Sequence, residues 1–398
     1  MAGFFPVFFK DYWCTGLAPP TSTFYLGTTN SLASLIIATM APFLGAIADR
    51  GGTKKKFLFF FVLLGVVMTS SLYFIAQGSW FLGAGVYFFA IIGFYGGNIF
   101  YDSLIVTVAP EEKLDFVSSL GFALGYLGGG LLFSFNVFMI LTPQTFGLYN
   151  SNEAIRISFL LVALWWMVFS IPLFVFVKED KVSTTLRPIN LVRSGFHQFF
   201  VTLKEIRKFK VVFLFLLGYW LYIDGVDTVI LMAIDYGKSI GFSSQSLIVA
   251  LLITQFVGFP AAIAFGKIGE KLGTKTGILI GISVYIGVTI WSYFMQRELE
   301  FYILAIIVGL VQGGVQSLSR SFYAKMVPKT KAAEFFGFYN MLGKFAAVIG
   351  PILIGWVSLI SERPRYSILS LSVLFVAGAI ILYFVDEKEG QRNARELE

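Results

Sequence analysis

Eleven apolar runs in this sequence are each long enough to cross a lipid bilayer as a helix. The core of a bilayer offers no water to backbone N–H and C=O groups, so a chain that crosses it with long apolar runs does so as helices. Only 13% of the 398 residues are charged, against about 25% in soluble domains. The sequence therefore predicts an all-α polytopic membrane protein. The runs are residues 25–48, 57–76, 81–107, 117–141, 155–177, 211–233, 245–266, 276–295, 301–324, 335–359 and 367–385.

The N-terminal stretch Met1 to Phe9 is also apolar, but as a helix it would cover only about 14 Å. We expect it to be the outer half of a twelfth helix whose beginning is absent, so that the first helix is truncated. A short helix lying at the membrane interface is the alternative. No positively charged segment precedes the stretch, which argues against a cleaved signal peptide.

One pattern, Gly-x-x-x-acid-base-x-Gly-Thr-Lys, occurs twice, 221 residues apart, each time at the end of an apolar run. The first copy spans Gly45 to Lys54 and the second spans Gly266 to Lys275. A similar offset of 218 residues relates Asp102 to Arg320. Duplication of a structural unit leaves such traces. The sequence therefore predicts two six-helix bundles related by a pseudo-twofold axis along the membrane normal.

The longest hydrophilic stretch lies between the two predicted bundles. Its later part has apolar residues at helical spacing with basic residues between them, which predicts an amphipathic helix on the membrane surface. We interpret it as a linker, with a regulatory segment as the alternative. The predicted division is residues 1–177 for the N-terminal bundle, 178–210 for the linker, 211–385 for the C-terminal bundle and 386–398 for a tail.

Basic residues are concentrated in alternate loops. Of the 30 Lys and Arg residues, 22 lie on one side of the predicted membrane and six on the other. The positive-inside rule assigns the basic side to the cytoplasm, so both termini are expected there, in a multi-pass protein of the cytoplasmic (inner) membrane. The basic side comprises residues 49–56, 108–116, 178–210, 267–275, 325–334 and 386–398.

Several kinds of chemistry have no sequence support. The single Cys14 and single His197 exclude a disulfide framework and a multi-histidine metal site. The phosphate-binding pattern Gly-x4-Gly-Lys-Ser/Thr, the zinc pattern H-E-x-x-H and a nucleophile elbow do not occur. We therefore expect neither an enzyme nor a cofactor. The expected partners are the lipid bilayer and a small-molecule substrate, with no nucleic acid, and the chain is expected to be monomeric.

Several segments resemble a known family. Residues 45–55 are similar to the loop signature between helices 2 and 3 of the major facilitator superfamily. Residues 121–130 resemble its helix 5 antiporter signature, with Tyr126 in place of proline. Residues 222–226, 312–321 and 336–345 are similar to helices 7, 10 and 11 in the branch that includes the autophagy-related vacuolar amino-acid effluxers and their bacterial relatives.

The resemblance implies the major facilitator fold and secondary transport of small organic solutes by alternating access, with amino-acid efflux as the family-level expectation. A flippase for lipids or lipophilic compounds is one alternative. A non-transporting membrane sensor or scaffold is the other.

Ionisable side chains inside the predicted spans are the first candidates for a functional site, because they are costly in a bilayer. Asp224 and Asp227 share one helix face, and Lys344 lies near mid-depth of a later helix. A carboxylate that is protonated at one stage and pairs with Lys344 at another would couple transport to protons. The alternatives are a static buried ion pair and the wall of a water-filled cavity, with Asp227 solvated near the outer mouth.

Four uncharged polar residues extend this candidate pathway. They either line it or hold neighbouring helices together by hydrogen bonds. They are Tyr222, Gln312, Gln316 and Asn340.

A cytoplasmic gate is predicted near the inner ends of the helices. In the superfamily that this chain resembles, the inner ends of helices 4 and 10 meet when the inward path closes, so a salt bridge between Asp102 and Arg320 would form in one state only. The alternative partner of Asp102 is Arg50.

The resemblance also implies that Asp49 faces the start of helix 11, near Ala333 to Phe336, where free N–H groups favour an anion. Glu270 should repeat this contact at helix 5. We assign the Lys54 to Lys56 run only to the positive-inside pattern.

Overall fold

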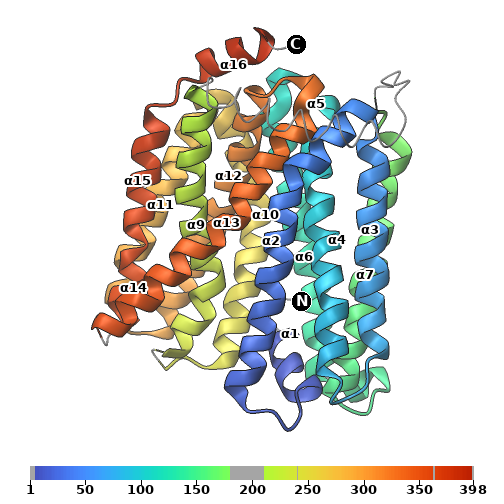
Figure 1. Cartoon of the computed structure of the whole chain (residues 1–398). Helices are drawn as coiled ribbons and strands as arrows, with labels where there is room; N and C mark the ends of the chain where they lie inside the picture. Colours follow the sequence, from blue (N-terminus) through green and yellow to red (C-terminus); the bar gives the residue numbers. More distant parts are fainter. Residues whose placement is uncertain (1–4, 180–209, 240, 362–363, 397–398) are drawn as a thin grey trace.

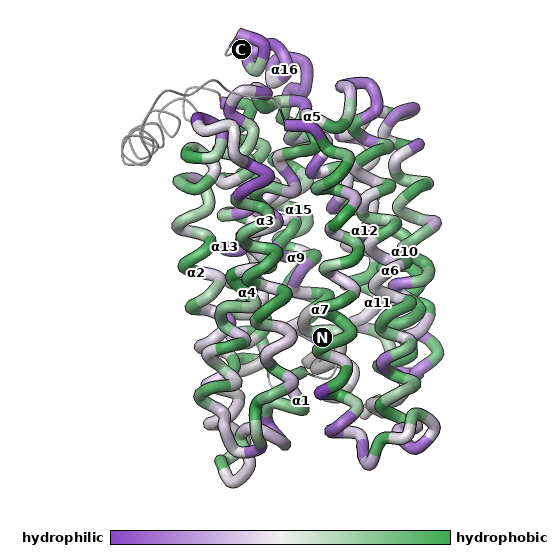
Figure 2. Tube along the Cα trace, turned by 90° about the vertical axis from the view of Figure 1, so that its right-hand side faces the viewer, coloured by the Kyte–Doolittle hydropathy of each residue, from purple (hydrophilic) through white to green (hydrophobic). Residues whose placement is uncertain are grey.

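The computed structural model describes residues 5–179, 210–239, 241–361 and 364–396, which are helical almost throughout and contain no strand (Figure 1). Ten helices among them are long and apolar enough to cross a membrane. A further 30-residue helix, α13, runs through the same layer (Figure 1). Figure 2 shows hydrophobic residues along the middle of the helices and hydrophilic residues gathered at the end that carries the C-terminus. The predicted all-α membrane protein is confirmed.

Each of the eleven predicted spans corresponds to one helix, or in three cases to a helix with a short helical segment beside it. The first bundle contains α2 (Pro19–Gly51), α3 (Lys54–Ser71), α4 (Trp80–Ser103) with α5 (Ile105–Val108), α6 (Leu114–Leu141) and α7 (Ser151–Phe176). The second bundle contains α9 (Lys210–Ser239), α10 (Ser244–Leu272), α11 (Thr274–Phe294), α12 (Glu298–Lys325), α13 (Ala332–Ser361), α14 (Pro364–Ser370) and α15 (Ser372–Tyr383).

Short helical segments connect and flank these helices. They are α1 (Phe5–Phe8), the π-helical η1 (Phe9–Trp13), η2 (Leu72–Phe74), η3 (Glu111–Lys113), η4 (Pro143–Phe146), η5 (Lys329–Lys331) and α16 (Glu387–Glu396). The predicted amphipathic linker lies outside the described residues.

The first helical segments, α1 and η1, pack inside the N-terminal bundle. Phe8, Phe9 and Trp13 are fully buried. The ring of Trp13 stacks on Phe159 of α7, with 6.0 Å between the centroids. Residues 5–13 therefore occupy the position that the sequence assigned to a first helix, as a short segment held by aromatic packing.

The two bundles repeat the same set of helix contacts. Within the first bundle α2 packs on α4, α3 on α4 and α3 on α7, and within the second α10 packs on α12, α11 on α12 and α11 on α15. Between the bundles α2 packs on α13, and α10 packs on α6 in the equivalent way. The contacts thus have the pseudo-twofold relation that the repeated pattern predicts.

The first glycine of each repeated pattern lies where two bundles cross. A Cβ on Gly45 would collide with the Ala333 carbonyl of α13, and a Cβ on Gly266 would lie 2.8 Å from the Ser119 Cβ of α6. Within α13, Gly337 makes the reciprocal close contact with the backbone of α2. The duplicated glycines therefore let the backbones of the two bundles touch.

Gly45→Ala should separate α2 from α13 and destabilise the protein by about 1–3 kcal/mol, because the new methyl group meets backbone atoms that cannot turn aside. Gly27→Ala in the same helix is the matched control, since a Cβ at Gly27 meets nothing within 4 Å. Thermal unfolding of the purified protein in detergent measures both. Equal unfolding midpoints for the two variants would contradict the close crossing.

Candidate functional site

Asp49 anchors the start of α13. Its carboxylate accepts hydrogen bonds from the backbone N–H groups of Ala333 (3.1 Å) and Glu334 (2.8 Å), and the Lys54 ammonium lies 2.8 Å away. Free N–H groups and the helix dipole make a helix start favourable for an anion. The contact expected from the resemblance is present. It joins the end of α2 in one bundle to the start of α13 in the other.

Lys55, directly after the first repeated pattern, and Lys275, at the end of the second, have structural roles that the sequence did not reveal. The Lys55 ammonium donates to two carbonyl oxygens at the end of α7, at 2.9 and 2.6 Å. The Lys275 ammonium donates to two carbonyl oxygens at the end of α15 and just after it, at 2.6 and 2.9 Å. Cations stabilise helix C-termini, where carbonyl groups lack partners. The prediction that the Lys54 to Lys56 run serves only the charge asymmetry is wrong.

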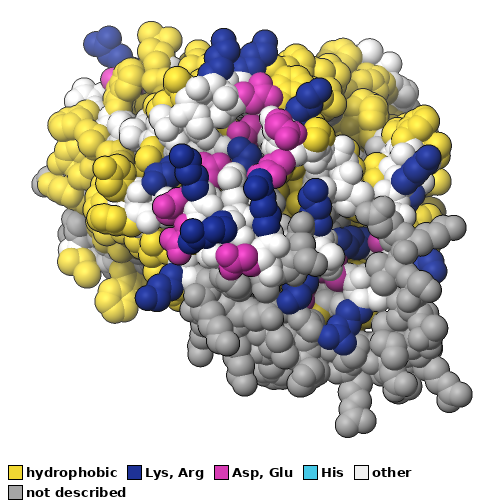
Figure 3. Space-filling view, turned by 90° about the horizontal axis from the view of Figure 1, so that it is seen from above, with side chains coloured by type: hydrophobic (Ala, Val, Ile, Leu, Met, Phe, Trp, Pro, Cys, Tyr) yellow, Lys and Arg dark blue, Asp and Glu magenta, His cyan; other side chains and the backbone are white. Residues whose placement is uncertain are grey.

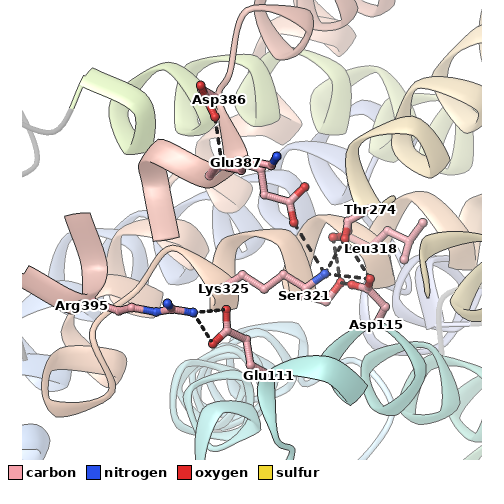
Figure 4. A network of polar contacts seen from close by, with 10 residues as sticks. Glu111, Asp115, Thr274, Leu318, Ser321, Lys325, Asp386, Glu387 and Arg395 are labelled. Carbon is pink, nitrogen blue, oxygen red and sulfur yellow. Dashed lines mark hydrogen bonds and ion pairs between the residues drawn. The ribbon is translucent and has the colours of Figure 1, made fainter. Parts of the chain in front are cut away.

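The prediction for Glu270 is also wrong, because its side chain is exposed. The acidic residue at this crossing is Asp115, in the first turn of α6 (Figure 4). Its carboxylate accepts hydrogen bonds from Ser321 (2.6 Å), Thr274 (2.8 Å) and Lys325 (2.8 Å). The sequence contained a signal for Asp115, namely its position in the first turn of a helix, where acidic residues are favoured.

Asp102 and Arg320 form the ion pair predicted between equivalent positions of the two bundles, with 3.1 Å between Nη1 and Oδ1. Arg320 also donates to the hydroxyl (3.0 Å) and the carbonyl (2.9 Å) of Ser118 in α6. The Asn340 amide donates to the second oxygen of Asp102 at 3.1 Å. The geometry therefore favours Arg320 over Arg50 as the partner of Asp102, and places Asn340 in the gate.

The bundles meet at the end that carries α16 and separate toward the other end. We call the first the basic end, and Figure 3 shows Lys and Arg side chains across it. Along α6, a Cβ at Gly121 would meet Arg320 and Tyr101, whereas Gly125 and Gly129 on the same face are exposed and meet nothing within 4 Å. Helices α2 and α13 diverge in the same direction (Figure 1). The structure is closed at the basic end.

Exchanging the charges of the gate tests this pairing. Asp102→Arg or Arg320→Asp alone should each destabilise the protein by about 3–5 kcal/mol, because a buried charge loses its partner. The double variant should recover part of this loss in unfolding measured in detergent. The corresponding exchange of Asp102 with Arg50 should recover nothing. Recovery only with Arg50 would assign the ion pair to that residue.

Asp224 is fully buried and bound to α13 rather than to Lys344. Its carboxylate accepts hydrogen bonds from the backbone N–H groups of Ile349 (3.0 Å) and Gly350 (2.9 Å) and from the Thr228 hydroxyl (3.2 Å). A carboxylate with several N–H and O–H donors is stabilised as an anion without a cation. In this conformation, the pairing of Asp224 with Lys344 predicted from the sequence does not occur.

Asp224→Asn should lower the unfolding free energy by about 1–3 kcal/mol, since the amide NH2 would face a backbone donor and leave it unpaired. Asp227→Asn, three residues along the same helix, is the matched control. Asp227 has no hydrogen bond or ion pair to any residue that the structure describes, so Asp227→Asn leaves no backbone donor unpaired and should lower the unfolding free energy less than Asp224→Asn does. Equal losses would mean that the Asp224 contacts contribute nothing.

Lys344 and Asp227 are opposite charges that do not neutralise each other by direct contact. The Lys344 ammonium lies 3.5 Å from the ring centroid of Tyr95, on α4 of the other bundle. Asp227 interacts electrostatically with Lys344 but forms no ion pair with it within 4 Å. Both side chains are half-buried. Charges in such surroundings are costly without partners, so Lys344 and Asp227 are the best candidates for binding a charged ligand.

Some of the other candidate residues lie between the two bundles, and some lie inside the second bundle. Tyr126 of α6 packs against Gly258 and Gly313, and its hydroxyl donates to Gln316 at 3.1 Å. Tyr222 is fully buried, with its hydroxyl 2.7 Å from Ser319 of α12. Tyr126 and Gln316 thus link the bundles, while Tyr222 lies inside the second bundle and not at the space between them.

Gln312 lies at the wall of a cavity of about 90 Å³ inside the second bundle, between α9, α10, α11 and α12. The lining of this cavity is mostly apolar, and its members include Leu247, Val288 and Leu304. Close by, the Tyr285 hydroxyl of α11 is buried without a hydrogen-bond partner among the described residues and interacts electrostatically with Asp227. Gln312 therefore borders a mostly apolar cavity, and it also interacts by a side-chain hydrogen bond with Tyr126 of the first bundle.

Sequence reasoning missed Tyr95, although a signal for it existed. Tyr95 precedes Asp102 by seven residues, two helical turns on the same face of α4. On α13, Asn340 and Lys344 are one turn apart. These faces of α4 and α13 contact each other at two points along the helices. Asp102 accepts a hydrogen bond from Asn340, and Tyr95 contacts Lys344.

Comparisons with known proteins identify relatives along almost the whole chain. A family model described as "Vacuole effluxer Atg22 like" matches residues 16–114 and 107–395. A protein of Bacillus subtilis (strain 168), "Uncharacterized MFS-type transporter YxiO", is 42% identical over 386 residues, which cover 96% of this chain and 90% of that protein. "Autophagy-related protein 22" of Yarrowia lipolytica (strain CLIB 122 / E 150) is 23% identical over 469 residues, which cover 96% of this chain and 79% of that protein.

Solved structures share the fold at low sequence identity. The proton:xylose symporter XylE bound to 6-bromo-6-deoxy-D-glucose matches with a TM-score of 0.73 and 13% identity, over 100% of this chain and 94% of that one. FucP, solved in the outward conformation, matches with a TM-score of 0.63 and 13% identity, over 97% and 96% of the two chains.

Proposed function

Because the chain belongs to the Atg22-like branch of the major facilitator superfamily, we propose that it exports small zwitterionic solutes, amino acids foremost, by alternating access. Membership makes the chain a multi-pass membrane transporter and not an enzyme. The substrate, the direction and the coupling are the proposed part. The charge asymmetry of the loops supports a place in the cytoplasmic membrane with the basic end inside.

The observation that carries the proposal is the unneutralised pair of Lys344 and Asp227. An amino acid brings a carboxylate and an ammonium group a few ångströms apart. Its carboxylate would bind the Lys344 ammonium and its ammonium group would bind Asp227, so that both buried charges gain charge-assisted hydrogen bonds. Tyr95 supports Lys344 through the face of its ring, a contact that leaves the ammonium free to donate.

Alternating access is supported by the asymmetry of the contacts between the bundles. The gate pair Asp102 with Arg320 and the contact of Asp49 with α13 both close the basic end in this conformation. Each of them joins the two bundles, so each must break if the bundles rock apart at that end. With the basic end in the cytoplasm, this conformation faces outward, and the opposite one would expose Lys344 and Asp227 to the cytoplasm.

Proton coupling is proposed through Asp227 rather than Asp224. The oxygens of Asp224 already accept three hydrogen bonds, whereas Asp227 has no hydrogen bond within the described parts of the chain. A proton and the ammonium group of a substrate would compete for the Asp227 carboxylate. Proton binding from outside would then release the substrate outward, and the protonated transporter would return, so export would be coupled to proton entry.

The same pair of charges speaks against the flippase alternative. Acyl chains placed between Lys344 and Asp227 would remove water from two charges and provide no polar partner. Burial of an uncompensated charge costs several kcal/mol. A zwitterion satisfies both charges at once.

Binding of zwitterions can be tested without knowing the natural substrate. Each of the twenty common L-amino acids is added to the purified protein, and thermal stabilisation is measured. For each amino acid that stabilises, the amine lacking the carboxylate and the acid lacking the ammonium group should bind at least tenfold more weakly, since each loses one charge-assisted contact, worth about 2 kcal/mol.

Lys344→Gln should abolish the preference for the carboxylate, and Asp227→Asn the preference for the ammonium group, whereas Lys178→Gln, outside the spans, should change neither. In vesicles, Asp227→Asn should also make counterflow insensitive to an imposed pH gradient. Equal stabilisation by a zwitterion and by its singly charged analogues would refute the assignment.

A further inference from the structure

The C-terminal helix α16 lies across the basic end, beyond the last membrane helix (Figure 1). Its small residues Gly390 and Ala394 face the body of the protein. A Cβ on Gly390 would lie 2.6 Å from the Met326 sulfur and 3.3 Å from Val211, and Ala394 is only 6% exposed. Helix α16 is thus docked against the ends of α12 and α9, although its composition is strongly polar.

The far end of α16 reaches the first bundle. The Arg395 guanidinium lies 3.3 Å from the Glu111 carboxylate of η3, just before α6 (Figure 4). A pocket of about 250 Å³ lies beneath α16, and its walls come from all three parts: Leu114 of the first bundle, Val327 of the second and Gln391 of α16. Helix α16 therefore spans the junction between the bundles.

The near end of α16 is joined to the same junction through one lysine. The Glu387 carboxylate lies 3.7 Å from the Lys325 ammonium, which also lies 2.8 Å from the Asp115 carboxylate of α6 (Figure 4). Lys325 is at the end of α12, so it already links the second bundle to the first. One side chain thus takes part both in closing the basic end and in holding α16.

We propose that α16 is a strap that stabilises the closed basic end and must leave one bundle before that end opens. The proposal rests on alternating access but not on the identity of the substrate. Opening separates the start of α6 from the end of α12, and with them Glu111 from Met326. A helix docked on both sides cannot keep both contacts during this movement.

The contacts of the strap are weak enough to be broken in each transport cycle. Arg395 and Glu111 are 69% and 41% exposed, and exposed ion pairs contribute little and are screened by salt. Burial raises the pKa of the Glu387 carboxyl in spite of the Lys325 ammonium, so the nearby cation does not compensate fully for lost water. The Arg395 contact, which reaches the first bundle directly from α16, is therefore the better one to alter.

Hydrogen exchange of the full chain in nanodiscs, without added solute, tests the strap. Peptides covering residues 114–121 and 317–325 report the junction. Arg395→Glu should increase their exchange rate about two- to fivefold, the factor expected for the loss of one exposed ion pair. A chain that ends at Asp386 should show at least the same increase. High salt should raise exchange in the unaltered protein and have little further effect on the variants.

Arg392→Glu is the matched control, because it makes the same change of charge on an exposed residue of α16 that has no hydrogen bond or ion pair with the described parts of the chain. It should leave exchange unchanged, and Glu111→Arg combined with Arg395→Glu should restore the slow exchange of the unaltered protein. Unchanged exchange in the truncated chain would overturn the strap. So would an equal effect of the Arg392 and Arg395 variants. Neither result would bear on zwitterion binding, since no solute is present.

Discussion

Two helix bundles in a bilayer gain no hydrophobic free energy by meeting each other, because lipid tails are as apolar as the side chains they replace. The junction here depends instead on close backbone contact and on polar bonds. Gly45 and Gly337 bring α2 and α13 together, and Asp49 then binds the N–H groups at the start of α13. Such a junction is held by a limited number of directional contacts at one end. It can therefore be opened by breaking these contacts at one end.

The buried charges of this protein differ in how they are satisfied, and this difference separates structure from function. Asp224 is satisfied by backbone N–H groups within its own bundle, so it fixes α13 relative to α9. Asp102 and Arg320 satisfy each other across the junction, so their pairing depends on conformation. Asp227 and Lys344 have the fewest protein contacts, and an unsatisfied charge in a bilayer is where a substrate gains most by binding.

Duplication of one bundle explains why many contacts at the basic end occur twice. Some contacts nevertheless differ between the two copies. The crossings at Gly45 and Gly266 are equivalent, and a lysine at the end of each repeat or directly after it stabilises the end of the last helix of its bundle. The acidic partners differ, since Asp49 comes from the repeat itself whereas Asp115 comes from the opposing helix. Helix α16 adds a contact at the basic end that has no counterpart in the first bundle among the residues described.

The sequence alone determined the spans, the two bundles and the family, and it left Arg320 and Arg50 as the two possible partners of Asp102. The spans and the bundles follow from long-range patterns of hydropathy, repeated spacing and charge, and the family follows from the resemblance of several motifs. The tertiary structure decided for Arg320. The sequence could not determine which acid interacts with Lys344, that Glu270 is exposed, or that Tyr222 lies inside a bundle. Those outcomes depend on the rotation of each helix about its own axis. Asp224 and Asp227 are less than one turn apart, so only the packing of α9 against α13 decided which carboxylate meets backbone donors and which is left for a ligand.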